Sequence, residues 1–295
     1  MNTVPRPRTS RNWDCSRNGR DDKAKELRQR IDDSLDGLAR AVDDVRASDT
    51  FQRFLVVQAR FHRYSWHNSM LIALQRPDAT QVAGYRTWQK LGRQVRAGEH
   101  GIMIFAPCPW TREVERDGDT ESESGIYFKP VHVFDVAQTD GEELPTVDVP
   151  TVDTAADGLL ARLVRVAEHR GIAVNFGAVS GGAFGVSKGG AVDVDNRHAT
   201  GQQAKTLAHE LAHEALHKSD RPAGLTYSAA ELEAESVAYV VCLHFGVDTE
   251  VRSSRYIALW DGDSKALRAS LERIANTARA LIDDAEGLDA RKAVA

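Results

Sequence analysis

Two stretches in the C-terminal half carry apolar residues at the spacing of amphipathic helices. The first runs from about residue 200 to residue 216, and its apolar stripe consists of Ala204, Leu207, Ala208, Leu211, Ala212 and Leu216. The second runs from Ser228 to Cys242, and its buried face consists of Ala230, Ala234, Val237, Ala238 and Val241,. Thr200 and Gln203 have the spacing of a capping box, which predicts that they open the first helix,.

Shorter patterns predict the remaining elements. In the N-terminal half we expect helices within 23–45 and 48–75, and strands at 102–105 and 127–136 with a solvated acidic loop at 117–124 between them,. In the C-terminal half we expect a helix at 159–170 ended by Gly171, a strand at 172–176 and a closing helical region at 253–284,. Residues 184–187 and 191–194 are expected to form a hairpin around Lys188, Gly189 and Gly190,. This mixture of elements favours an α+β fold.

The length of 295 residues is typical of two domains,. Residues 139–157 are rich in Asp, Glu, Pro and Thr and are predicted to be a linker,. The arginine-rich residues 1–20 are expected to be a disordered arm. The two domains are therefore predicted at 21–138 and 158–295.

His209, Glu210 and His213 form an HExxH motif within the first of the two helices. Histidines four positions apart share one face of a helix, so both can bind a single Zn²⁺ through neutral rings. Glu210 lies beside them, where it can act as a general base that takes a proton from the attacking water. We expect His209 and His213 to be zinc ligands and Glu210 to be the catalytic residue.

A catalytic zinc site of this type needs a third protein ligand, and the second helix offers three glutamates,. Glu231 lies nearest the centre of the buried face, so it is the first choice. Glu235, one turn further on, is expected to accept a hydrogen bond from a ligand histidine and orient it. Glu233 points towards the other side and is the fallback ligand.

Three further residues in or near the two helices are candidates for supporting roles at the site. His217 lies about 6 Å of helical rise beyond His213, too far to join the same tetrahedron, so we expect it at the helix end or beside a ligand. Tyr227 and Tyr239 are candidates for stabilising the oxyanion of a peptide-cleavage reaction,.

Residues 51–110 combine positive charge with aromatic rings. They contain eight Lys or Arg and two acids, a net charge of +6, and nine of the twenty aromatic residues of the chain. Cations bind phosphates and rings stack on unpaired bases, so this composition suits single-stranded DNA. The same rings and charges also suit an ordinary core with a solvated surface.

The candidate DNA-binding residues of this segment lie in one short run: Arg86, Trp88, Lys90, Arg93 and Arg96. The three cations at 90, 93 and 96 are the strongest candidates for phosphate contacts,. Trp88 is either a stacking platform or part of the core. Tyr64, Trp66 and Tyr85 are further possible platforms.

Several segments of the sequence resemble those of a known family. Residues 206–217 and 231–238 resemble the ImmA/IrrE-type zinc metallopeptidase domain, particularly the version carried by ArdC-like antirestriction proteins. Residues 64–68, 75–77 and 82–102 are similar to the single-stranded-DNA-binding domain at the front of ArdC-like proteins. In related zincins a Glu-x-x-x-Asp/Asn/Glu pattern on the second helix supplies a ligand and then a supporting residue, which agrees with Glu231 and Glu235.

The resemblance implies a single-stranded-DNA-binding domain followed by a zincin-like, gluzincin-type endopeptidase domain. It also implies a role in protecting incoming plasmid or phage DNA from restriction, with an unidentified protein substrate. Two alternatives stay open: a regulatory ImmA-like protease that cleaves a repressor, and a non-catalytic DNA-binding protective protein. An intact Glu210 disfavours the second, because a purely structural zinc site does not need it.

Overall composition excludes some classes of protein. The net charge of −5 is too small for a wholesale DNA mimic. The three cysteines, Cys15, Cys108 and Cys242, form no CxxC pair and indicate a reducing compartment,. The chain shows no signal-peptide pattern and no apolar run approaching 18 residues, so we expect a cytoplasmic protein without a membrane span,.

Overall fold

The structure is a computed structural model that describes residues 25–36 except 27 and 34, 45–116, 119–143, 152–217, 225–249 and 264–294. The expected disordered arm at 1–20 lies outside the described residues. The helices are α2 (Val45–Arg60), α3 (Trp66–Gln75), α4 (Tyr85–Lys90), α5 (Val152–His169), α6 (Thr200–Leu216), α7 (Tyr227–His244) and α8 (Ser264–Val294). The strands are β1 (Val82–Gly84), β2 (Arg93–Val95), β3 (Ile102–Arg116), β4 (Asp119–Asp135), β5 (Thr139–Gly141), β6 (Ala173–Gly177), β7 (Gly185–Ser187) and β8 (Ala191–Asp195).

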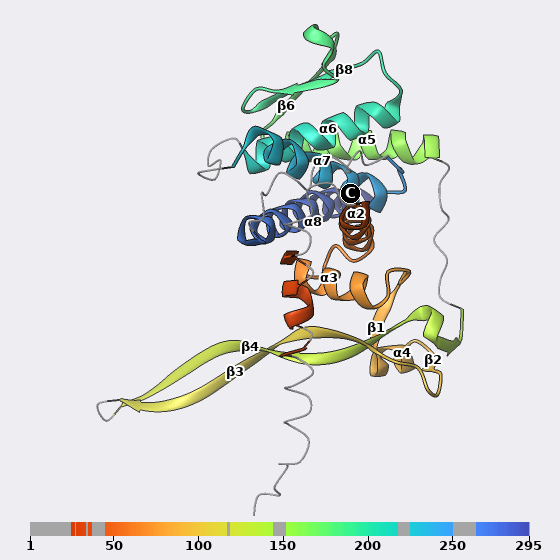
Figure 1. The fold of residues 1–295 in the computed structure, drawn as a ribbon. Coiled ribbons are helices and arrows are strands. Elements are labelled where there is room, and N and C mark those ends of the chain that lie inside the picture. Colours follow the sequence, from red (N-terminus) through yellow and green to blue (C-terminus); the bar gives the residue numbers. More distant parts are fainter. Residues whose placement is uncertain are drawn as a thin grey trace, which may run out of the picture.

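This mixture of helices and small sheets confirms the α+β class. The elements form successive layers (Figure 1). A three-stranded sheet in the order β6-β8-β7 covers α5 and α6. Below these helices lie α7, α8 and α2, followed by α3 and a long β3–β4 hairpin that projects from the body. Among the described helices, none is long and apolar enough to cross a membrane.

The β3–β4 hairpin corrects one expectation. The acidic residues 117–124 were expected to be a loop, but β4 begins at Asp119 and pairs with β3 in register from Arg116↔Asp119 to Ile102↔Val133. Antiparallel pairing satisfies the backbone polar groups of a solvated strand as well as water does, so acidity does not exclude a strand here. The sheet is completed by β1 in the order β1-β4-β3.

One hydrophobic cluster joins the two halves of the chain. Phe51, Phe54 and Leu55 of α2 belong to the same buried cluster as Val237 and Val241 of α7. Helix α2 therefore contacts α7 directly. The division into two domains at 138 and 158 stays a prediction.

The expected linker at 139–157 overlaps two regular elements. At its start β5 pairs with β2, and at its end α5 begins at Val152, while 144–151 lie outside the described residues. Helix α5 is followed by Gly171 at φ +70°, a left-handed conformation that suits glycine after a helix end,. The predicted strand and hairpin of the following segment are confirmed as β6 and as β7 with β8.

Candidate metal centre and nucleic-acid interface

Helix α6 positions the HExxH residues. It begins at Thr200, and its N-cap is Ala199 without a side-chain hydrogen bond, so the predicted capping box is wrong. Thr200 is already the first helical residue, and Gln203 donates instead to the carbonyl of His198 at 2.6 Å. The apolar stripe of the helix is buried as expected, which turns His209 and His213 towards α7.

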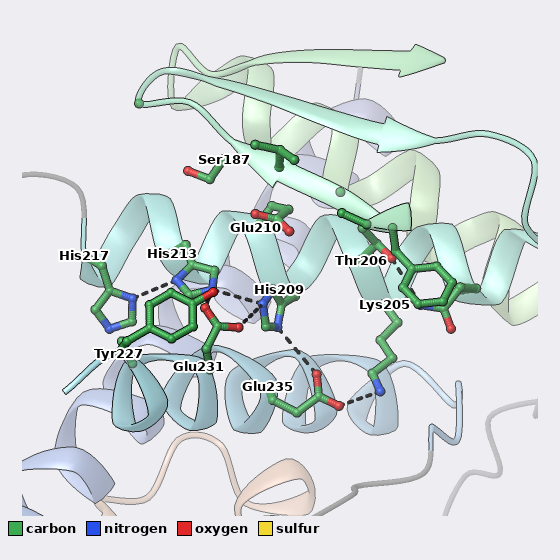
Figure 2. Close-up of a pocket in the computed structure, with 17 residues that line it drawn as sticks. Ser187, Lys205, Thr206, His209, Glu210, His213, His217, Tyr227, Glu231 and Glu235 are labelled. Carbon is green, nitrogen blue, oxygen red and sulfur yellow. Dashed lines mark hydrogen bonds and ion pairs between the residues drawn. The ribbon is translucent and has the colours of Figure 1, made fainter. Parts of the chain in front are cut away.

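Two histidines and one glutamate converge between α6 and α7 (Figure 2). The Nε2 atoms of His209 and His213 lie 3.0 Å apart. A Glu231 oxygen lies 3.5 Å from the Nε2 atom of His209, and the other lies 3.4 Å from that of His213. One ligand atom from each residue fits within 4.8 Å of the others, so the three side chains could hold one metal ion.

Glu235 lies behind this group, where the sequence placed it. One of its oxygens is 3.5 Å from the Nδ1 atom of His209, and the other is 2.6 Å from the ammonium of Lys205. An acceptor at Nδ1 keeps a proton on that nitrogen and leaves Nε2 free as a donor atom for a metal. Glu235 therefore has the geometry of the orienting residue.

Glu233 faces the opposite side of α7. Its carboxylate is buried and accepts hydrogen bonds from Ser270 and Arg273 of α8, with the Nε atom of Arg273 at 3.1 Å. His217, which caps the C-terminus of α6, lies 3.4 Å from Glu233 and 3.0 Å from the Nδ1 atom of His213. The structure thus places His217 beside His213, and it places Glu233, the fallback ligand, away from the two histidines of the HExxH motif.

Glu210 is 8% exposed and lines the same pocket as the histidines. Burial raises the pKa of Glu210, while His209 and His213 oppose that shift. A hydrogen bond from the Ser187 backbone of β7 also opposes it. A carboxylate that is desolvated and close to imidazoles is suited to taking up and releasing a proton.

The charges of His209 and Glu231 depend on each other. Burial lowers the pKa of His209, but hydrogen bonds to Glu231 and Glu235 outweigh burial and raise it to about 9. Hydrogen bonds from His209 and His213 hold the pKa of Glu231 far below its usual range. A cation between these groups would replace the protons that they now share, so the donor set fits a divalent metal.

Strand β7 closes one side of the pocket and approaches α6 closely. A Cβ atom at Gly185 would lie 2.5 Å from Cγ2 of Thr206 and 3.1 Å from Cγ of Glu210. Only glycine therefore allows this approach without displacement. Strand β7 is the edge of its sheet, so on one side of its backbone no described strand pairs with it.

Sequence reasoning missed Glu214, which anchors the turn between β7 and β8. Its buried carboxylate accepts the backbone N–H groups of Gly189 and Gly190 at 2.8 Å each, and also the Ser187 hydroxyl. The two glycines adopt φ values of +71° and +94°. Glu214 follows the motif directly, but only the fold brings the turn to it.

The pocket over these residues has a volume of about 960 Å³. Tyr227 lines it and is 70% exposed. Tyr239 does not line this pocket and packs partly buried against the main core instead. The expectation of an oxyanion role for Tyr239 is therefore wrong, because it lies on another face of α7.

Some of the predicted DNA-binding residues have partners within the protein, and others are exposed. Trp88 is 2% exposed and donates its Nε1–H to the carbonyl of Phe134 at 2.9 Å, so its assignment to DNA is wrong. Arg93 donates to Thr139 and Glu142 and joins β2 to β5. Arg96 pairs with Glu99 at 2.8 Å and Asp140 at 3.3 Å. Both arginines already have partners, which weakens their case as phosphate contacts.

Arg86 and Lys90 of α4 are exposed, and among the described residues no ion pair involves them. Tyr85 beside them is 42% exposed. Trp66 is buried, whereas Tyr64 is half-buried, packs edge-on against Phe61 and lines a groove beside the hairpin. Of the candidate cations and platforms, Tyr85, Arg86 and Lys90 stay available at the surface.

A groove of about 870 Å³ beside the hairpin combines cations and rings. Arg28 lies over the ring of Phe105 at 4.7 Å, and Phe128 on β4 is 57% exposed. Sequence reasoning missed this groove. Of its lining residues, Tyr64 was a sequence candidate for a stacking platform, but no local spacing connected it with Phe105 or Phe128.

These features define an α+β protein with a two-histidine, one-glutamate site beside an HExxH glutamate. Residues 21–134 match the family model described as the N-terminal domain of the anti-restriction factor ArdC. Residues 21–134 are thus similar to the ArdC N-terminal domain, in agreement with the resemblance predicted from the sequence for this part of the chain.

A curated relative, the uncharacterized protein pXO2-81 of Bacillus anthracis, is 25% identical over 272 residues, covering 76% of this chain and 46% of that protein. The chain thus spans about half the length of the curated relative that it matches. Two crystal structures of the antirestriction ArdC protein from plasmid R388 are also similar. The metal-free one has 22% identity and a TM-score of 0.48, covering 75% of this chain and 83% of that one. The Mn(II)-bound one has 19% identity and a TM-score of 0.49, covering 83% and 97%.

Proposed function

We propose that this protein is a zinc-dependent metalloendopeptidase of the antirestriction type that also binds single-stranded DNA. The observation that carries the proposal is the convergence of His209, His213 and Glu231 on one point, with the buried Glu210 in the same pocket. Two imidazoles and one carboxylate leave a fourth position open, which is typical of catalytic rather than structural zinc.

His209, His213 and Glu231 would hold the metal, and Glu235 would orient His209 through its Nδ1–H,. When bound, zinc supplies Lewis-acid polarisation of water and of the scissile carbonyl. Glu210 would take the proton of the attacking water and deliver it to the leaving amine. Its raised pKa suits both steps, because the group must bind a proton transiently at neutral pH.

The substrate would lie along β7. Its free edge runs beside the pocket, so an extended peptide can add to the sheet through backbone hydrogen bonds,. Such binding places a peptide bond near Glu210 without demanding a particular side chain. Tyr227 at the rim could then contact the carbonyl oxygen of the substrate,.

Single-stranded DNA would bind along the groove at the hairpin. Phe128 offers an exposed ring for stacking, and Arg28 supplies a cation beside Phe105,. The net charge of +6 over residues 51–110 attracts the phosphates, and the groove lies mostly within the part that matches the ArdC N-terminal domain,. The similarity of residues 21–134 to the N-terminal domain of the anti-restriction factor ArdC supports a role in protecting incoming DNA from restriction.

The peptidase proposal is tested by incubating metal-loaded wild-type protein and Glu210→Gln with a library of unstructured peptides. Wild type is expected to cleave, and Glu210→Gln is expected to lose about 100-fold or more in rate while it keeps its metal. Glu168→Gln, on the exposed face of α5, is the control. Cleavage by wild type and Glu210→Gln at equal rates would contradict the role of Glu210. Absence of any cleavage would favour the non-catalytic alternative.

The DNA proposal is tested on the full chain by fluorescence anisotropy with single-stranded and duplex oligonucleotides. Phe128→Ala is expected to weaken single-strand binding by about 5- to 100-fold, the effect of one base stack. Tyr127→Ala is the matched control, because neighbouring residues on a strand face opposite sides. Equal affinity for single strands and duplex would remove the claim.

A further inference from the structure

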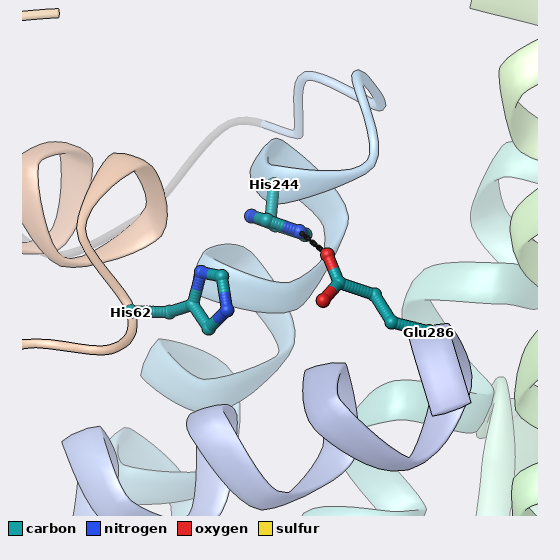
Figure 3. A group of neighbouring side chains, drawn as sticks. All are labelled: His62, His244 and Glu286. Carbon is teal, nitrogen blue, oxygen red and sulfur yellow. Dashed lines mark hydrogen bonds and ion pairs between the residues drawn. The ribbon is translucent and has the colours of Figure 1, made fainter. Parts of the chain in front are cut away.

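A second group of two histidines and one glutamate lies at the opposite end of α7 from the first (Figure 3). His62 follows α2, His244 is the last residue of α7, and Glu286 lies on α8. One ligand atom from each lies within 4.8 Å of the others. At 1.5 Å of rise per residue, Glu231 and His244 are about 20 Å apart along α7, so the two groups are separate.

The hydrogen bonds of His244 define which of its nitrogens faces the group. Its Nδ1 atom lies 3.0 Å from the carbonyl of Ala59, so that nitrogen carries the proton,. Its Nε2 atom lies 3.1 Å from Glu286 Oε1. A neutral ring would then point a lone pair at a carboxylate, a contact that requires either a second proton or a cation. A metal-binding histidine usually donates one ring N–H to a backbone carbonyl or carboxylate, as Nδ1 of His244 does here, which leaves the other nitrogen for the metal,.

His62 is 7% exposed, and neither of its ring nitrogens has a hydrogen-bond partner among the described residues. Its nearest acid is Asp283, at 3.7 Å from Nε2, which is too long for a hydrogen bond,. Burial and the neighbouring His244 lower the pKa of His62, which favours the neutral ring. A buried polar group without a partner is costly, and a neutral imidazole beside a histidine and a carboxylate offers a lone pair to a metal.

The charges around the group are compatible with a cation. Asp283 and Glu286 lie one turn apart on α8, on the same side as the histidines,. Arg63 pairs with the other oxygen of Glu286 at 3.1 Å, but its side chain is 74% exposed, so water screens its charge,.

We propose that His62, His244 and Glu286 bind a second divalent transition metal of the zinc class. Two imidazole nitrogens and one carboxylate oxygen are a normal zinc donor set, and Asp283 or water can complete the tetrahedron. Ligands about 2.0 Å from a tetrahedral zinc lie about 3.3 Å apart, so the widest pair must close by at most about 1.5 Å. A rotation of the His62 side chain would supply this movement.

The consequence is a metal link between the two halves of the chain. His62 lies in the segment that matches the ArdC N-terminal domain, and His244 lies on the helix that carries Glu231. A metal at this point fixes α7 and α8 against the turn after α2. Its role is structural, since the described pocket at the first site does not reach these residues.

The test uses the full chain carrying both His209→Ala and His213→Ala. Because these changes remove two ligands of the first site, zinc bound by this variant reports on the second site alone, whether or not the proposed peptidase function is correct. After removal of metal and dialysis against zinc, we expect about one equivalent of zinc and a rise in Tm of about 5 °C. Cobalt should give the visible absorption of a tetrahedral nitrogen and oxygen site. Adding His62→Ala or Glu286→Gln should weaken zinc binding at least about tenfold, whereas the exposed His132→Ala should not,.

Glu286→Gln keeps the size of a side chain that is 37% exposed, so its fold is expected to survive and circular dichroism can verify this. Two results would overturn the proposal. One is that the double histidine variant binds no zinc. The other is that it binds zinc with an affinity unchanged by both His62→Ala and Glu286→Gln. The His244–Glu286 contact would then be an ion pair.

Discussion

Glu214 offers a sharp test of how the pocket is built, because one carboxylate holds the turn that carries β7. It accepts two backbone N–H groups at 2.8 Å and one hydroxyl, and it is 6% exposed. Hydrogen bonds to a charged group contribute about 1.5–3 kcal/mol each. Because the turn itself is partly exposed, hydrogen bonds to water can replace part of this free energy when the carboxylate is absent.

The substitution Glu214→Gln keeps the volume of the side chain, but its NH₂ group cannot accept from the second glycine N–H. We expect the turn to lose about 2 kcal/mol of local stability, which corresponds to about 30-fold faster amide exchange at Gly189 and Gly190. Metal content should not change, because His209 and His213 face α7 rather than the turn. Peptide cleavage should fall together with the loss of an ordered β7.

Hydrogen–deuterium exchange with mass spectrometry over residues 185–192 measures the effect, with Glu168→Gln as the control for loss of one exposed charge. The salt bridge between Lys188 and Asp193 remains in the variant, so the opening should be confined to the turn. An exchange rate that changes by less than about threefold would refute the anchoring argument.

Three further predictions concern other parts of the chain. Gly185→Ala should cost about 1–3 kcal/mol of unfolding free energy in a denaturant titration, because its Cβ would meet Thr206 at 2.5 Å; an unchanged midpoint would contradict the close approach,. The double change of Arg86 and Lys90 to Ala should flatten the slope of log K against log salt for single-stranded DNA by up to about 1.4, whereas Arg93 and Arg96 to Ala should flatten it less. In a Cys15→Ser background, only Cys108 should react with a thiol reagent in the native protein, because burial raises the pKa of the Cys242 thiol to about 12; two reactive thiols would argue against the buried position.

Helical periodicity predicted much of the candidate site. The stripe of Leu207 and Leu211 defined the buried face of α6, and the histidines follow from it. The structure directs Glu231 and Glu235 towards the histidines and Glu233 towards α8. The expectation that Glu231 lies nearest the centre of the buried face is wrong, because Glu233 is fully buried whereas the Glu231 side chain is 34% exposed. The roles of Glu231 and Glu235 as ligand and orienting residue stay predictions.

What the sequence did not predict depends on contacts between distant segments. The sequence left Trp88 open between a stacking platform and the core, because its hydrogen-bond acceptor, the carbonyl of Phe134, lies on a strand far along the chain. Glu214 and the group of His62, His244 and Glu286 were missed for the same reason, since no local spacing connects their partners. Residues 119–124 were misread as a loop because a long antiparallel hairpin can carry charged residues, while 117 and 118 lie outside the described residues,.

The central claim is that His209, His213 and Glu231 bind one catalytic metal. Anomalous diffraction from crystals of the full chain grown with zinc, recorded on both sides of the zinc absorption edge, tests it most directly. The account predicts a peak about 2.0–2.2 Å from Nε2 of His209, Nε2 of His213 and one oxygen of Glu231. A map with no peak between these three residues, or with Glu233 as the carboxylate ligand, would contradict it.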